Sequence, residues 1–141
     1  MQSHLFIALL SIISVAFSLK EPSFDAPLSE KQAYLLSKIN EERSIAGVGS
    51  LYLDDALNSP AVQHSNDMAE NLFLSHTGSD GSSPSDRAGI SVSENVAYGS
   101  NLLSIHENLM NSPGHKANIL REGSTRVGIG ATVSNNYLFV T

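Results

Sequence analysis

The side chains in this sequence best suited to metal binding or acid–base chemistry are those of two histidines and a glutamate. His76 opens a loop rich in serine and glycine, Glu94 lies near the start of an expected strand, and His115 lies in the first turn of an expected helix. The positive end of a helix dipole disfavours protonation of an imidazole, which keeps His115 neutral as a metal ligand or proton acceptor requires. Two neutral imidazoles and one carboxylate, with positions left for water, are a donor set that a divalent ion such as zinc accepts.

The same residues also have a structural interpretation. Ser112-Pro113-Gly114 has the pattern of a helix start, with a serine N-cap and a proline at the first helical position, so His115 can be a solvated first-turn side chain. The two histidines and Glu94 can equally form a polar network that ties loops to a sheet. Residue types and spacing leave both interpretations open.

Several well-known catalytic and cofactor-binding motifs are incomplete in this chain. His106-Glu107 begins like a zincin helix, but Met110 stands where the second histidine must be. Gly128-Ile129-Gly130 lacks the third glycine and the following helix of a dinucleotide-binding loop. The sequence contains no Gly-x-Ser-x-Gly elbow, and the absence of cysteine excludes a thiol nucleophile. A serine or cysteine hydrolase therefore has little support.

The charge composition limits the classes of partner. The formal net charge is −6, and the eight lysines and arginines are scattered along the chain. Nucleic acid and anionic lipid surfaces attract proteins through basic patches, so we expect no nucleic-acid partner and no electrostatic binding to such membranes. With no disulfides available, the fold must depend on packing, with or without a bound ion.

The first residues have the pattern of a secretory signal peptide, which we predict over residues 1–18. Leu5 to Phe17 carries no charge, and Ala16-Phe17-Ser18 supplies small residues for cleavage. The apolar run is shorter than the roughly 20 residues of a transmembrane helix, so no stable membrane span is expected after cleavage. The n-region lacks lysine and arginine, and the alternative is a buried or membrane-lying N-terminal helix. We therefore predict a secreted, extracellular protein.

The remaining chain is the length of one domain, with an extended leader at residues 19–28 and a single domain at residues 29–141. Residues 29–32, from Ser29 to Gln32, form a capping box. It predicts the start of a helix that runs to about Ala46, with residues 40–43 on its solvated face. Further helices are expected from Pro60 to about Leu72 after the Ser59 cap, from Pro84 through Ala88 after Ser83, through Met110 after Ser100 or Asn101, and from Pro113 onward.

The expected strands follow these helices. His64 and Asp67 lie three residues apart on the second expected helix, where they could pair on the surface, and we interpret His64 as structural. Alternating apolar residues and asparagine turns predict strands at Ile90 to Tyr98, Arg126 to Val133 and Tyr137 to Val140, the last two joined by a hairpin turn at Ser134-Asn135-Asn136. Gly128 and Gly130 are expected where a larger side chain would clash with a close neighbour.

Six blocks, in order along the chain, closely resemble the CAP superfamily, also called the SCP-like extracellular domain. This superfamily includes cysteine-rich secretory proteins, antigen 5 and pathogenesis-related class 1 proteins. The match spans about Gln32 to Thr141 and is closest to the cysteine-free branch common in bacteria. The blocks are His64 to Ala69, Phe73 to His76, Asp80-Gly81, Glu94 to Gly99, Ser112 to Leu120, and Val127 to Gly130.

The resemblance implies an α+β fold, the CAP-type α-β-α sandwich, with a small antiparallel sheet between helical layers and an open cleft lined by two histidines and two acids. Position by position, His76, Glu94 and His115 match three of these four residues. Ser112 falls near the place of the second glutamate, so one acid is missing. Ser112, Asn95 and Asn118 are expected to support the cleft, the two asparagines by fixing loops through hydrogen bonds.

Together, these observations favour a secreted, non-enzymatic domain. Its cleft would bind a divalent metal ion, with zinc as the candidate, and a lipid, sterol or peptide ligand, as proposed for similar proteins. One alternative is a metal-dependent, peptidase-like hydrolase that uses Glu94 as the base and a zinc-bound water. Another is an extracellular interaction or envelope module that makes contact through the loop around Asp80.

Overall fold

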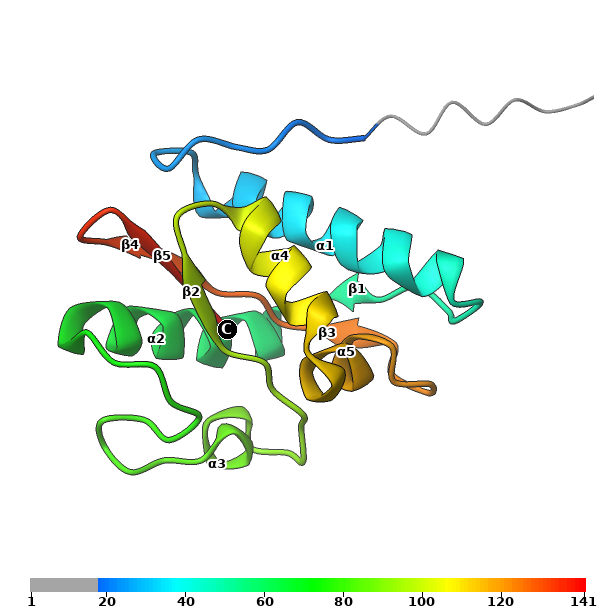
Figure 1. Cartoon of the computed structure of the whole chain (residues 1–141). Coiled ribbons are helices and arrows are strands. Elements are labelled where there is room, and N and C mark those ends of the chain that lie inside the picture. The colour runs from blue at the N-terminus through cyan, green and yellow to red at the C-terminus, as the bar shows by residue number, and fades with distance from the viewer. Residues whose placement is uncertain (1–17) are drawn as a thin grey trace, which may run out of the picture.

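The computed structural model describes residues 18–141, so the predicted signal peptide lies almost wholly outside the described residues (Figure 1). Within residues 18–141, no helix is long and apolar enough to cross a membrane. The helices of this part are α1 (Leu28–Ile45), α2 (Asp55–Asn71), α3 (Pro84–Ala88), α4 (Leu102–Asn111) and α5 (Pro113–Ile119).

A three-stranded antiparallel sheet lies between the helical layers. Its strands are β2 (Ala97–Gly99), β4 (Ala131–Ser134) and β5 (Tyr137–Val140), in the order β2-β5-β4, while β1 (Tyr52–Leu53) and β3 (Arg126–Val127) form a separate parallel pair. Helix α2 lies along one side of the sheet, and α1 and α4 lie on the other (Figure 1). The predicted α+β class is confirmed.

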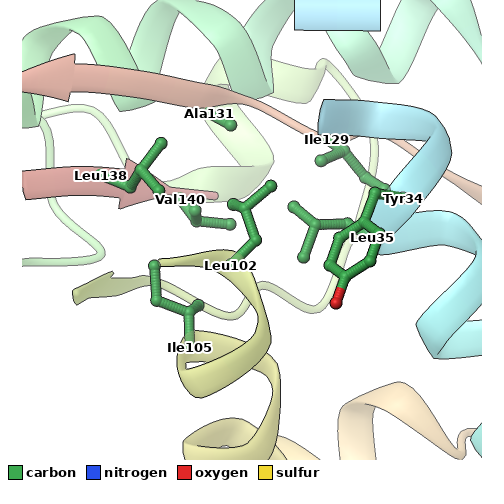
Figure 2. Close-up of a cluster of buried hydrophobic side chains, with 8 residues drawn as sticks. All are labelled: Tyr34, Leu35, Leu102, Ile105, Ile129, Ala131, Leu138 and Val140. Atoms are coloured by element: carbon green, nitrogen blue, oxygen red, sulfur yellow. The ribbon is translucent and has the colours of Figure 1, made fainter. Parts of the chain in front are cut away.

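The side-chain alternation of β5 divides the core into two clusters. Leu138 and Val140 point toward α1 and α4 and join a cluster of buried residues there (Figure 2). Phe139, between them, points to the opposite face and packs with Met68 of α2, because successive residues of a strand face opposite sides. The other members of the first cluster are Tyr34, Leu35, Leu102, Ile105, Ile129 and Ala131.

Three of the predicted helix starts are confirmed. Helix α3 begins after Ser83, which forms a capping box with Asp86, and ends at Gly89 with φ +68°. Asn101 caps α4 by accepting a hydrogen bond from the Ser104 amide at 2.8 Å. Helix α5 begins at Pro113, although the Ser112 side chain makes no capping hydrogen bond.

Two predicted helix starts are wrong. Helix α1 begins at Leu28, two residues earlier than the Ser29 cap predicts, and it has no side-chain cap because its N-cap residue is Pro27. The Gln32 side chain donates to the Ile129 carbonyl instead of completing a capping box. Helix α2 begins at Asp55, where the Asp54 carboxylate accepts from the Leu57 amide, and it continues through Pro60. Proline interrupts the hydrogen-bond ladder of a helix. The Asp54 cap and the buried face of α2 outweigh that cost.

The expected strand at residues 126–133 is interrupted by a close approach to α2. A Cβ atom at Gly128 would lie 2.1 Å from the Leu57 carbonyl oxygen, and one at Gly130 would lie 2.2 Å from that of Ala61. The strand expected from Ile90 is shorter and begins only at Ala97, so Glu94 lies in irregular chain before it.

Two polar side chains that were predicted at the surface are buried. Arg43 is 1% exposed and donates hydrogen bonds to four backbone carbonyls, those of Gly49, Ile119, Arg121 and Ser124, at 2.6 to 3.1 Å. His64 is also 1% exposed, and it contacts the Ser75 carbonyl rather than pairing on the surface. Both corrections have one cause: loops outside the helices bring carbonyl acceptors over these side chains.

The leader is fixed to the domain rather than detached from it. The Glu21 carboxylate accepts a hydrogen bond from the Leu103 amide at 3.1 Å, in the first turn of α4. Phe24 packs against the core cluster between α1 and α4. An acidic side chain at a helix N-terminus is stabilising because it opposes the helix dipole.

Candidate functional site

The Glu94 carboxylate is held at both of its oxygens. The His76 Nδ1 atom lies 2.8 Å from Oε1, and Arg87 Nη2 donates to Oε2 at 2.6 Å. Arg87 comes from the last turn of α3, and its Nη1 also donates to the carbonyls of His76 and Ser82. Sequence reasoning brought His76 and Glu94 together but missed Arg87. Its only signal is a basic residue in the last turn of a short capped helix.

The side chains in this group differ in exposure. His76 is 53% exposed, whereas Arg87 and Glu94 are each 10% exposed. A carboxylate that orients an accessible imidazole is the arrangement that general bases use. Within the described residues, however, no serine, threonine or cysteine nucleophile is hydrogen bonded to His76. The group can hold an imidazole in a fixed orientation.

His115 joins this region through its backbone. The Asn95 side chain donates to the His115 carbonyl at 3.0 Å, and Asn118 donates to the Glu94 carbonyl at 3.2 Å and to the Asn95 side chain at 2.9 Å. Ser112 lies at the junction of α4 and α5, where its carbonyl accepts from the Lys116 amide at 2.8 Å. The two asparagines thus tie α5 to the chain around Glu94.

These residues do not fit an ion held jointly by His76, Glu94 and His115. Within residues 18–141, no three His, Asp or Glu side chains are arranged so that they could hold a metal ion. Both Glu94 oxygens are engaged, and the Arg87 guanidinium beside them repels a cation. Zinc binding therefore stays a prediction of the resemblance, and the function proposed below does not depend on a metal.

A cavity of about 510 Å³ borders this group. Arg87 and Glu94 line it, whereas neither His76 nor His115 is among the described residues on its wall. Ligand pockets typically measure roughly 300–1,000 Å³. Most of the wall is apolar and comes from α1, α2, α4, α5 and the segments beside them, with contributions from Leu35, Ile39, Leu57, Ile90, Leu109 and Ile119.

The charged side chains of the cavity are mainly basic. Arg87, Arg121 and Arg126 line it, together with a single carboxylate, that of Glu94, which Arg87 already pairs. His106 also contributes to the wall and is 4% exposed, with its Nε2 atom 3.8 Å from a Glu42 oxygen. Burial lowers the pKa of His106 below its usual value, so this imidazole is neutral at neutral pH.

The sequence is similar to a known protein family and to a bacterial protein. The pattern of the CAP family, described as the Cysteine-rich secretory protein family, matches residues 36–141. The uncharacterized protein YkwD of Bacillus subtilis (strain 168) is 30% identical over 121 residues, which cover 81% of this chain and 47% of YkwD. The chain thus spans about half the length of this curated relative.

Solved structures have the same fold. An outer surface protein from Borrelia burgdorferi is similar with a TM-score of 0.72 and 22% identity, over 86% of this chain and 94% of that one. An extracellular protein containing a SCP domain from Bacillus anthracis str. Ames is similar with a TM-score of 0.60 and 24% identity, over 82% of this chain and 43% of that one. Since the family pattern covers most of the sequence, and helices enclose the same small sheet, the chain belongs to the CAP family.

Proposed function

We propose that this CAP domain is a secreted, non-enzymatic binding protein, and that its cavity takes a lipid with an apolar chain and an acidic head group. The observation that carries the proposal is the cavity of about 510 Å³, whose wall combines apolar side chains with three arginines. The chain as a whole has a net charge of −6. A basic excess around one cavity of an acidic protein favours an anionic ligand.

Arg121 is the side chain best placed to bind the acidic head group. Arg87 pairs with Glu94, and Arg126 pairs with Asp54 at 2.8 Å. Among the described residues, Arg121 forms no ion pair, and its side chain makes one long contact, to Asn118 Oδ1 at 3.4 Å. Its guanidinium can therefore donate to a carboxylate in a bidentate manner without breaking an existing pair.

The proposed location outside the cell has separate support. Two similar solved structures are described as an outer surface protein and an extracellular protein. The apolar run from Leu5 to Phe17, with the small residues of Ala16-Phe17-Ser18 at its end, has the pattern of a signal peptide. Mass spectrometry of the secreted chain should therefore find Leu19 at the N-terminus, and an uncleaved, cell-retained chain would contradict this part of the proposal.

The ligand is tested by titration with cis-parinaric acid, a fluorescent fatty acid, followed by displacement with palmitate. Saturable binding is expected, with palmitate displacing the probe better than 1-hexadecanol, which has the same chain and no acid. Arg121→Gln should remove most of that preference. Displacement by cholesterol or a peptide but not by palmitate would overturn the proposed ligand class.

A pair of matched variants tests whether the lipid binds in the cavity. Ser93 lines the cavity and Ser100 does not, and both are exposed loop serines. Ser93→Phe should block binding of the probe, because the ring occupies cavity volume, while Ser100→Phe should leave it unchanged. Equal affinity in the two variants would show that the lipid binds elsewhere.

A further inference from the structure

His106 places a polar ring on a side of the cavity that is otherwise apolar. It comes from the middle of α4, and Leu109, three residues later on the same face of that helix, lines the cavity with it. Helix α1 contributes Leu35 and Ile39. Of the described cavity residues that α1 and α4 supply, His106 is the only polar one.

The ring nitrogens of His106 form no hydrogen bond with a described residue. Oε1 of Glu42 lies 3.8 Å from Nε2, which is too far for a hydrogen bond. In the described part of the chain, the fully buried side-chain polar atoms without a partner belong to His64, Ser82 and Thr141. The nitrogens of His106 are not among them, so they keep accessible surface. Because His106 lines the cavity, a molecule bound there can reach its ring.

This imidazole is unsuited to an acidic head group. Burial lowers the pKa of His106, so the ring is neutral at neutral pH. The Glu42 carboxylate beside it would also repel a second carboxylate. A neutral imidazole has one N–H donor and one lone pair, whichever nitrogen carries the hydrogen. A hydroxyl group both donates and accepts, so it can pair with either nitrogen.

We propose that His106 binds a hydroxyl group on the chain of the lipid, so that the preferred ligand is a hydroxylated fatty acid. This inference rests on the function proposed above, in which Arg121 binds the acidic head group. A plain alkyl chain would displace water from the ring without replacing its hydrogen bonds, and such a displacement loses affinity. A hydroxyl at the right position on the chain restores one of these bonds.

Helix α1 brings His106 and Arg121 to the same part of the cavity. Arg43 Nη1 donates to the Arg121 carbonyl at 3.1 Å. Glu42, the preceding residue of α1, has its carboxylate 3.8 Å from the His106 ring. Both His106 and Arg121 line the cavity, so one chain can place its acid at Arg121 and a hydroxyl at His106.

Displacement of cis-parinaric acid tests the inference. The competitors are palmitate and hexadecanoic acids that carry one hydroxyl at carbon 2, 8, 12 or 16. At least one hydroxylated acid should bind about five- to twentyfold more tightly than palmitate, because it gains a hydrogen bond and leaves no ring nitrogen unsatisfied. If palmitate binds and no hydroxylated acid binds more tightly, this inference is overturned and the proposed function stands. Binding by none of the acids would overturn both.

Two variants of His106 separate hydrogen bonding from packing. His106→Phe keeps a ring but has no donor or acceptor, so it should bind palmitate at least as tightly as the unchanged chain and lose the preference for the hydroxylated acid. His106→Gln keeps one donor group and one acceptor, so it should retain part of that preference. An undiminished preference in His106→Phe would show that the hydroxyl binds elsewhere and would overturn the inference.

NMR of the ¹⁵N-labelled, unchanged chain gives a direct measurement. The ring nitrogens of His106 should shift on saturation with the preferred hydroxylated acid, because a hydrogen bond forms at one of them. Saturation with palmitate should shift them much less. Equal shifts with the two acids would contradict a hydrogen bond between the hydroxyl and this ring.

Discussion

Replacing Arg43 with methionine should destabilise the fold more than any exposed substitution of the same kind. The Arg43 side chain is 1% exposed and comes from α1, and its four carbonyl partners lie in two other segments, Gly49 and residues 119–124. Methionine has a similar length but cannot donate a hydrogen bond. Arg43→Met therefore removes four donors at once and leaves their carbonyls facing an apolar side chain.

The magnitude follows from the number of carbonyls affected. A buried acceptor that loses its donor costs about 1 kcal/mol or more. Relaxation of the loops will recover part of the cost, so we expect a loss of roughly 3–5 kcal/mol in the free energy of unfolding. Domains of this size are stable by only about 5–15 kcal/mol, so the variant should remain only marginally folded. Ile119 and Ser124 also line the cavity, so lipid binding should weaken as well.

Urea unfolding followed by circular dichroism measures the change. Arg43→Lys is the matched variant, because it keeps the charge but loses the planar set of donors, and its loss should be intermediate. Arg126→Met, which breaks an exposed ion pair with Asp54, should have a much smaller effect. A loss below about 1 kcal/mol in Arg43→Met would refute the reasoning that these four hydrogen bonds hold the segments together.

Three further outcomes are expected. Burial lowers the pKa of His106, so below a pH of about 6.5 the unfolded chain binds a proton at this residue more readily than the folded chain does. The free energy of unfolding should therefore fall as the pH drops below that value. Unfolding of His106→Gln, measured at several pH values, should lack this dependence. Thermal melting should show Gly128→Ala strongly destabilised, because its Cβ would lie 2.1 Å from a carbonyl oxygen, and Gly114→Ala unchanged or up to about 1 kcal/mol more stable, because nothing lies within 4 Å. Calorimetry should show tighter zinc binding in Arg87→Ala than in the unchanged chain, because the variant frees a Glu94 oxygen; equal affinities would show that the ion pair does not oppose zinc.

Local sequence patterns predicted the helix caps and the hairpin turn, because these features depend only on neighbouring residues. The capping box at Ser83, the Asn101 cap and the hairpin turn at Asn135 and Asn136, with φ of 49° and 63°, depend on residues within one turn of each other. The resemblance to the CAP superfamily supplied the fold and the meeting of His76 with Glu94, which spacing alone left open. Both kinds of information therefore contributed to the candidate site.

The features that the sequence concealed depend on distant contacts. The local pattern assigns Arg43 to a solvated face because its carbonyl partners at Ile119, Arg121 and Ser124 are 76 to 81 residues away. It makes Pro60 a helix start because the neighbouring residues do not reveal the Asp54 cap and the packing of α2 against the sheet. The cavity is bounded by side chains from several segments, so no single stretch of sequence indicates its existence.

The anchored leader matters to anyone choosing where to begin a recombinant fragment. The family pattern starts at residue 36, inside α1 and beyond the core residues Tyr34 and Leu35. A fragment cut there would lack half a helix, the aromatic ring of Phe24 and the carboxylate of Glu21 over α4. The cooperative unit therefore begins upstream of the family boundary, and truncation studies should retain the chain from Leu19.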